Sequence, residues 1–274
     1  MGVSKMLGTV TVIGAGVIGG AVVKCLKKYE EVGKVIATRR TLESLKGLKE
    51  IGAEVTIDNK AAAKKAEVIF LCVKPGDVGT VLKDIAAHVK GKLVISTAAI
   101  VPLSYYKRCA PGARFVRSMP NIAALVGESF TAYACDSSVT AEDREIVKDL
   151  LNSMGTCREV EEEYMDAVTG LSGSGPAFVA IVIDALMFAG LKVGLPRDLA
   201  LYSSAQSVLG TARMVLDMDM KPHDIEEMVT TPGGTTIEGI YEIEDGKLRT
   251  ALMNAVEAAT KKCESLSYKW ENGN

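Results

Sequence analysis

The sequence predicts an α/β fold in which an N-terminal doubly wound sheet is followed by an all-α C-terminal domain. Up to about residue 160, short β-branched runs alternate with helical stretches, which is typical of a parallel sheet with helices on both faces. After Glu161 this alternation ends, and apolar residues recur at helical spacing. A length of 274 residues suits two domains, which we place at residues 1–160 and 161–274.

The predicted strands are separated by glycine, proline or charged helical segments. They are Thr9–Ile13, Lys34–Ala37, Glu54–Ile57, Val68–Val73, Leu93–Ser96 and Arg114–Met119. Two shorter candidates, Phe130–Ala134 and Cys157–Val160, can extend the sheet. Between them we expect a helix from about Thr140 to Met154, because Thr140 and Asp143 form an approximate capping box. The expected helices of the second half are Pro176–Val193, Pro196–Leu216 and Lys247–Leu266.

Composition favours a small-molecule partner. A formal charge of −2 gives no electrostatic reason to expect nucleic acid or an anionic membrane surface. The six cysteines form no Cys-x-x-Cys pair, so we expect free thiols in a reducing, cytoplasmic compartment and neither a metal site nor a disulfide frame. The apolar run Ala177–Leu191 is shorter than the ~20 residues of a membrane span and contains Asp184. We expect it to be a helix buried in protein, with a second subunit as one possible cover.

A glycine fingerprint joins the first predicted strand to the helix Val17–Lys28. Its residues are Gly14, Ala15, Gly16, Val17, Ile18 and Gly19. In this context Gly14 makes the tight turn, Gly16 admits a pyrophosphate and Gly19 lets helix and sheet approach, as in a Rossmann-type domain. The alternative is a glycine-rich structural turn. We predict a dinucleotide site here.

The end of the second predicted strand indicates which dinucleotide binds. NAD sites carry an acidic side chain there. This chain instead has Thr38, Arg39, Arg40 and Thr41, whose hydroxyl and guanidinium groups suit a 2′-phosphate. NADPH is therefore the expected cofactor, with NADH as a second possibility. In the alternative interpretation the two arginines lie at the surface and pair with neighbouring acids.

Other loops follow strands at the same carboxyl edge, where ligands of such folds lie. Each loop alone is compatible with an ordinary connection. The residues that we assign to the cofactor from these loops are Val73, Lys74, Pro75, Ala98, Ala99, Met119 and Asn121.

Near the C-terminal end, a hydroxyl-rich bend interrupts helical sequence. It includes Thr231, Gly233, Gly234, Thr235 and Thr236. Backbone amides at such a helix entrance can hold a carboxylate, and the hydroxyls can contact a neighbouring heteroatom. A glycine bend with capping threonines is the structural alternative. The two histidines, His88 and His223, are expected at the surface.

Together these motifs resemble the pyrroline-5-carboxylate reductase family. The resemblance runs from the glycine fingerprint through Val73–Pro75, Met119–Asn121, Asp166–Ala177 and Thr231–Thr236 to Asn254–Ala258. It departs at Ile122-Ala123, where Thr-Pro is common, and at Met228, which replaces an asparagine. These departures affect local contacts more than the reaction.

The resemblance implies reduction of a cyclic imine carboxylate by NAD(P)H and a helical domain that interlocks with its mate in a homodimer, with rings of dimers in some members. It implies cofactor contacts at Arg39, Asn59, Val73, Lys74 and Ala99. Glu162, Thr235 and Thr236 fall at substrate positions, with Thr236 near the ring nitrogen. A protonated imine is already electrophilic, so alignment with the nicotinamide is the main demand and no strong base is required.

Two other functions are weighed against this one. The first is another NAD(P)H-dependent reductase of similar layout, which acts on bulkier imines or on hydroxyacids. The hydroxyacid enzymes need a proton donor, and the lysine that serves them has no counterpart between Gly170 and Ala180. A catalytically silent NADP-binding scaffold would combine an intact fingerprint with a ruined substrate loop, whereas both motifs are intact here.

Overall fold

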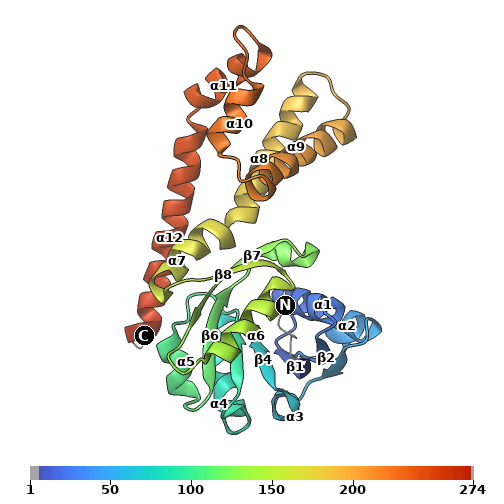
Figure 1. The fold of residues 1–274 in the computed structure, drawn as a ribbon, viewed down its shortest axis with the longest axis vertical. Coiled ribbons are helices and arrows are strands. Elements are labelled where there is room, and N and C mark those ends of the chain that lie inside the picture. The colour runs from blue at the N-terminus through green and yellow to red at the C-terminus, as the bar shows by residue number, and fades with distance from the viewer. Residues whose placement is uncertain (1–5, 273–274) are drawn as a thin grey trace. The chain divides into compact units, whose positions relative to one another are not determined.

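The computed structural model describes residues 6–272, which divide into two compact units. The α/β unit comprises residues up to Ser174 together with those from Ala258 onward, and the helical unit comprises Gly175–Glu257 (Figure 1). This division differs from the predicted boundary at residues 160 and 161. Residues after 160 pack on the α/β unit, where Asp166 accepts hydrogen bonds from Arg117 Nη2 at 2.8 Å and from Ser267 Oγ at 2.9 Å.

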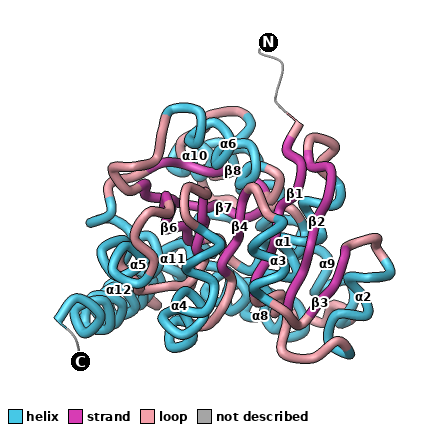
Figure 2. The backbone as a smooth tube through the Cα atoms, turned by 90° about the horizontal axis from the view of Figure 1, so that it is seen from below, coloured by secondary structure: helices cyan, strands magenta, loops and turns pink. Residues whose placement is uncertain are grey.

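An eight-stranded sheet forms the α/β unit, with the order β3-β2-β1-β4-β5-β6-β7-β8 (Figure 2). The strands are β1 Leu7–Ile13, β2 Val32–Thr38, β3 Glu54–Thr56, β4 Val68–Leu71, β5 Leu93–Ser96, β6 Arg114–Met119, β7 Ser129–Cys135 and β8 Gly155–Glu159. The predicted strands all form, and the two shorter candidates extend the sheet. The doubly wound α/β class is confirmed.

The sheet is mixed, which corrects the expectation of a wholly parallel one. Strands β1 to β6 are mutually parallel, but β7 pairs with β6 in the antiparallel sense, with Val116 opposite Cys135. Only residues 120–128 connect β6 to β7. This connection is shorter than the dozen or so residues that a parallel crossover needs, so the chain has to reverse direction.

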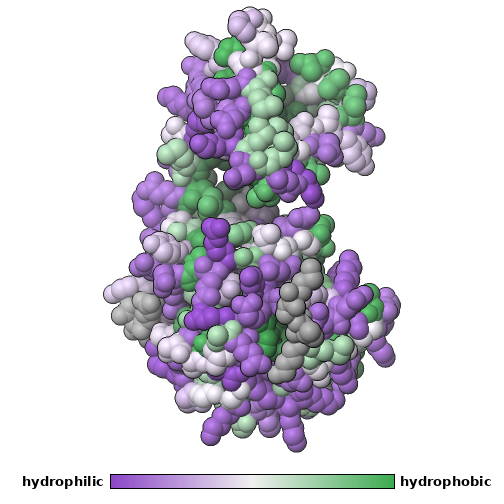
Figure 3. Space-filling model, in the orientation of Figure 1, coloured by the Kyte–Doolittle hydropathy of each residue, from purple (hydrophilic) through white to green (hydrophobic). Residues whose placement is uncertain are grey.

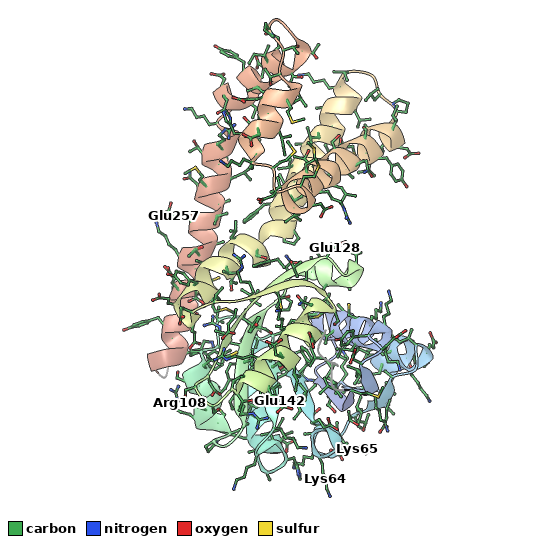
Figure 4. All side chains as sticks on the ribbon, in the orientation of Figure 1. Lys64, Lys65, Arg108, Glu128, Glu142 and Glu257 are labelled. Atoms are coloured by element: carbon green, nitrogen blue, oxygen red, sulfur yellow. The ribbon has the colours of Figure 1, made fainter. Side chains whose placement is uncertain are left out.

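Helices cover both faces of the sheet and enclose two apolar clusters. They are α1 Val17–Lys28, α2 Lys46–Glu50, α3 Asn59–Lys65, α4 Val78–Val89, α5 Leu103–Cys109, α6 Ala141–Asn152 and α7 Met165–Val168. Charges at helix ends oppose the helix dipole: Glu142 lies in the first turn of α6, and Lys64 and Lys65 lie in the last turn of α3 (Figure 4).

Helices account for the rest of the chain, as predicted. They are α8 Gly175–Lys192, α9 Arg197–Asp217, α10 Pro222–Val229, α11 Thr235–Asp245 and α12 Leu248–Asn272. The short helices α10 and α11 were not predicted individually, since few turns give a weak periodic signal. The C-terminal part of α12 belongs to the α/β unit, where Trp270 packs edge-on against Tyr105 and Arg108 donates to the Trp270 carbonyl (Figure 4).

Much of α8 is exposed within one chain, so the chain itself does not supply the cover that was expected for this helix. Ile181 is 68% exposed and Phe188 is 52% exposed. The helical segment Glu162–Lys192 contains an 18-residue window with a mean hydropathy of 1.8, and it is the one candidate membrane span among the described residues, by length and composition alone. Such a segment is weak support for a membrane helix, because a helix that is buried in the core of a soluble protein passes the same test.

The predicted capping box at α6 is present, and it is joined to a buried ion pair. The Thr140 hydroxyl accepts from the Asp143 amide, while the Asp143 carboxylate accepts from the Thr140 amide and from Arg114 Nε at 2.7 Å. Burial alone would raise the pKa of Asp143, but the hydrogen bonds from Arg114 and Thr140 outweigh it and lower the pKa. The ionised carboxylate therefore stabilises the fold.

We expect Asp143→Asn to lower the free energy of unfolding at pH 7 by about 1–3 kcal/mol, because a buried charged hydrogen bond is lost. A lowered folded pKa gives stability that is present above the unfolded value of about 3.9 and is lost as pH falls through the folded pKa. The difference between the variant and the wild type should therefore shrink below about pH 4. Urea denaturation at pH 7 and pH 3 tests this. Glu145→Gln, on an exposed side chain of the same helix, is the control, and an equal loss at both pH values would contradict the assignment.

Candidate functional site

The carboxyl ends of the parallel strands meet at one edge of the sheet. Ile13 at the end of β1 is in register with Thr38 of β2 and with Leu71 of β4, and Leu71 is in register with Ser96 of β5. The loops that leave these strands therefore start side by side. This is the edge at which ligands bind in open α/β sheets.

The glycine turn between β1 and α1 is fixed by steric limits. Gly14 has a φ of 89°, and a Cβ at this position would lie 2.9 Å from the Cys72 carbonyl carbon and oxygen. A Cβ on Gly19 would lie 2.5 Å from the Gly14 carbonyl oxygen, so only glycine lets α1 approach the turn. A Cβ on Gly16 would meet nothing within 4 Å. The chain thus leaves open space in front of Gly16, where a pyrophosphate fits against the first-turn amides of α1.

A cavity of about 650 Å³ lies at this edge. Predicted cofactor residues that line it are Gly14, Gly16, Thr38, Arg39, Arg40, Asn59, Val73 and Lys74. The structure therefore brings together residues from four separate loops. Thr41, the second hydroxyl of the predicted run after β2, also lines the cavity. The lining residues that were not predicted are Ile13, Ser44, Ile57, Cys72, Asp77, Thr80 and Val81. Ile13 and Cys72 are immediate chain neighbours of predicted residues, whereas the other five lie two or more positions from one, and no local motif marks them.

The remaining predicted cofactor residues are not in the lining of this cavity. Ala15, Val17, Ile18 and Gly19 form the turn and the first turn of α1, and Pro75 begins the short helix η2 (Pro75–Asp77). Ala98 and Ala99 follow β5, where the Ala98 amide donates to Ser96 Oγ at 3.3 Å. Met119 ends β6, and Asn121 Nδ2 donates to the Ser172 carbonyl at 3.1 Å. All of these positions lie in the α/β unit, and their contact with a nucleotide stays a prediction.

Polar side chains at the end of β2 are already ordered by the protein. Thr38 Oγ1 donates to Asn59 Oδ1 at 2.6 Å, which links the end of β2 to the start of α3. Arg39 Nη1 donates to the Ser44 carbonyl at 3.4 Å, and Arg40 Nη2 pairs with Asp77 Oδ2 at 2.9 Å. Arg40 thus pairs with an acid of the same chain, as the alternative interpretation expected.

Cys72 is the thiol within the cavity. Burial raises its pKa to about 12, although a hydrogen bond with Thr97 acts in the opposite direction. The thiol is therefore neutral at physiological pH, and it offers neither a nucleophile nor a metal ligand. Among the described residues, no group of three or more His, Cys, Asp or Glu side chains is arranged to hold a metal ion.

The loop after β5 is anchored by Glu162. Leu103 at the start of α5 donates its amide to Glu162 Oε1 at 2.8 Å, and buried Arg117 lies 3.4 Å from the same oxygen. Ile100, next to Ala99, has a φ of 64°, which is unusual for a β-branched residue. Glu162 thus braces a loop of the α/β unit. The predicted contact of Glu162 with substrate stays a prediction.

The hydroxyl-rich bend lies in the helical unit, at the entrance to α11. Gly233 has a φ of 71°, and the Gly234 amide donates to the Thr231 carbonyl at 2.9 Å. Gly234 is the N-cap of α11, and no side chain caps this helix start. The first-turn amides of α11, which begin at Thr235 and Thr236, are therefore available to an external acceptor such as a carboxylate.

Comparison with known proteins gives matches to segments of both units. A family model described as pyrroline-5-carboxylate reductase dimerisation matches residues 162–266, and one described as NADP oxidoreductase, coenzyme F420-dependent, matches residues 9–100. The pyrroline-5-carboxylate reductase of Methanosarcina acetivorans is 39% identical over 94% of this chain and 97% of its own length. That of Glycine max is 43% identical over 79% of each chain.

A solved structure also has a similar fold. The pyrroline carboxylate reductase of Plasmodium falciparum with NADP bound superposes with a TM-score of 0.86 at 29% identity, over 94% of this chain and 98% of that one. The fold, the cavity and these similarities define an NAD(P)H-dependent oxidoreductase, with NADPH as the cofactor. Within that class, the chain belongs to the pyrroline-5-carboxylate reductase family.

Substitutions at three glycines, in α1 and in the turn before it, distinguish an effect on nucleotide binding from an effect on folding. We expect Gly16→Ala to leave stability unchanged but weaken NADPH binding by about tenfold, or ~1.4 kcal/mol, because the new methyl group occupies the open space for phosphate. Gly19→Ala should also lower the free energy of unfolding, by about 1–3 kcal/mol, because its Cβ would press on the Gly14 carbonyl oxygen.

Gly20→Ala is the matched control, because its Cβ would meet nothing within 4 Å and it lies inside the helix. Nucleotide fluorescence titration and urea denaturation measure the two effects. Unchanged NADPH affinity in Gly16→Ala would contradict the assignment of the phosphate to this turn.

Proposed function

We propose that this chain reduces 1-pyrroline-5-carboxylate to L-proline with NADPH, the final step of proline biosynthesis, and that residues 161–274 supply its substrate and dimerisation functions. The observation that carries the proposal is a dinucleotide cavity with a basic, acid-free β2 end, in a chain related over nearly its whole length to pyrroline-5-carboxylate reductases. We further propose a cytoplasmic homodimer, which can assemble into a ring of dimers. NADH is a second possible cofactor.

The cofactor end of the site is assigned by chemistry. The open space at Gly16 receives the pyrophosphate, and Arg39, Arg40 and Thr38 surround the ribose that carries the 2′-phosphate. The remaining predicted loop residues, from Val73 to Pro75, Ala98, Ala99, Met119 and Asn121, border the nicotinamide half. When bound, the dinucleotide supplies the hydride that the imine carbon accepts.

The substrate end is assigned to the entrance of α11. The amides of Gly233, Gly234 and Thr235 hold the carboxylate, with Thr231 and Glu162 beside the substrate. The Thr236 hydroxyl hydrogen-bonds the ring nitrogen as that nitrogen loses its positive charge. This chemistry needs alignment and no strong base, which suits a site without a histidine or a reactive thiol.

Thr236→Ala should lower kcat/KM by about tenfold, or ~1–2 kcal/mol, as expected for one lost hydrogen bond. Thr236→Ser, which keeps the hydroxyl, should recover most of the activity. Steady-state NADPH oxidation with pyrroline-5-carboxylate measures both variants, and Thr250→Ala, at an exposed position of α12, is the control. An unchanged kcat/KM in Thr236→Ala would remove this hydroxyl from the mechanism. The same assay with 2-oxo acids and hydroxy acids tests the hydroxyacid alternative.

A second copy of the chain is the proposed cover for the apolar surface of the helical unit. Val179, Ile181, Leu186 and Phe188 are all more than 40% exposed on α8, and apolar side chains are visible on the helical unit in Figure 3. An exposed apolar surface of this kind marks an interface. The match to a dimerisation model over residues 162–266 supports the same assignment.

Ile181→Asp should shift the protein from dimer towards monomer, because a buried charge in an apolar interface is costly. Analytical ultracentrifugation measures the change, and circular dichroism checks that the variant stays folded. Ile51→Asp, at an exposed isoleucine of the α/β unit, is the control and should leave the assembly intact. A folded Ile181→Asp variant that dimerises as tightly as the wild type would exclude this face of α8 from the interface.

A further inference from the structure

The ion pair between Arg40 and Asp77 joins two segments that line the cofactor cavity. Arg39, Arg40, Thr41 and Ser44 line it from the segment after β2, whereas Lys74, Asp77, Thr80 and Val81 line it from the segment after β4. Arg40 Nη2 lies 2.9 Å from Asp77 Oδ2. By contrast, Arg39 donates to the Ser44 carbonyl, and the Thr41 and Ser44 hydroxyls lie 3.0 Å apart, so these contacts stay within the segment after β2.

The position of Asp77 points to a role beyond helix capping. Asp77 directly precedes α4, but its backbone is already helical, with a φ of −92° and a ψ of −13°, unlike that of an ordinary capping aspartate. Here its side chain makes no capping hydrogen bond, and the carboxylate reaches Arg40 instead. The guanidinium that the 2′-phosphate would use is thus already occupied by an acid of the same chain.

We infer that Asp77 is a specificity-determining residue, whose carboxylate competes with the 2′-phosphate for Arg40 and so moderates the preference for NADPH over NADH. This inference rests on the proposed cofactor site. A carboxylate and a phosphate both bind a guanidinium through paired hydrogen bonds, so the two groups compete for the same donors. NADH carries no 2′-phosphate, so its binding does not require Arg40 to leave Asp77.

The pair is exposed, since the Arg40 side chain is 85% exposed and that of Asp77 is 41% exposed. Its effect should therefore be modest. We expect Asp77→Asn to lower the Kd for NADPH relative to that for NADH by about twofold to fivefold, the range that one exposed ion pair supplies. In an Arg40→Gln background, the same substitution should leave the ratio of the two Kd values unchanged.

Fluorescence titration of the full-length protein with NADPH and with NADH measures both constants. Asp84→Asn is the matched control, because Asp84 lies on the same helix and forms an exposed ion pair with Lys60 at 2.8 Å, outside the cavity lining. Thermal unfolding reports any loss of stability at the start of α4. The control removes the same charge and should not change the ratio.

Three results would overturn the inference. These are weaker NADPH binding in Asp77→Asn, an equal change for both nucleotides, and an effect that persists in the Arg40→Gln background. A protein that shows the expected shift in Kd but leaves pyrroline-5-carboxylate unreduced would count against the proposed reaction and would support the role of Asp77. A wild-type protein that binds neither nucleotide would overturn both the cofactor site and this inference.

Discussion

The close approach of helix α1 to the turn after β1 is the constraint on which the cofactor site depends. Helix and strand can meet at this distance only because position 19 has no side chain, since a Cβ there would stand 2.5 Å from the Gly14 carbonyl oxygen. This approach aims the first-turn amides of α1 at the carboxyl edge of the sheet. The parallel register of β1, β2 and β4 then brings the loops that recognise the rest of the dinucleotide to the same edge.

The protein already orders the polar side chains that are proposed to bind the cofactor. Thr38 is fixed by Asn59, and both arginines after β2 have partners before any nucleotide arrives. Preorganised side chains lose less conformational entropy on binding, but each existing partner must be displaced or shared. In the proposed site, cofactor choice is a balance between the arginines and the acid that pairs with Arg40. The mere presence of basic residues does not decide it.

The two units differ in how much apolar side-chain surface they expose to solvent. The α/β unit buries two apolar clusters on the faces of its sheet, and so it completes its core within one chain. By contrast, α8 leaves large apolar side chains exposed, which a soluble monomer rarely does over a contiguous surface. The proposed second copy of the chain covers α8. This cover explains how so apolar a helix can occur in a reductase whose other unit completes its own core. It also explains why hydropathy alone cannot distinguish this helix from a membrane span.

The sequence by itself determined the α/β class, the strands, the long helices and the residues at the carboxyl edge, because β-branched runs, helical periodicity and glycine turns are local signals. It also indicated the reductase family through motifs at both ends of the chain. Only the tertiary structure decided that β7 runs antiparallel, that the end of α12 returns to the α/β unit, that Glu162 braces the loop after β5 and that Asp77 holds Arg40. These features join residues far apart in the chain, and their partners are chosen by packing and charge in three dimensions, which no local pattern encodes.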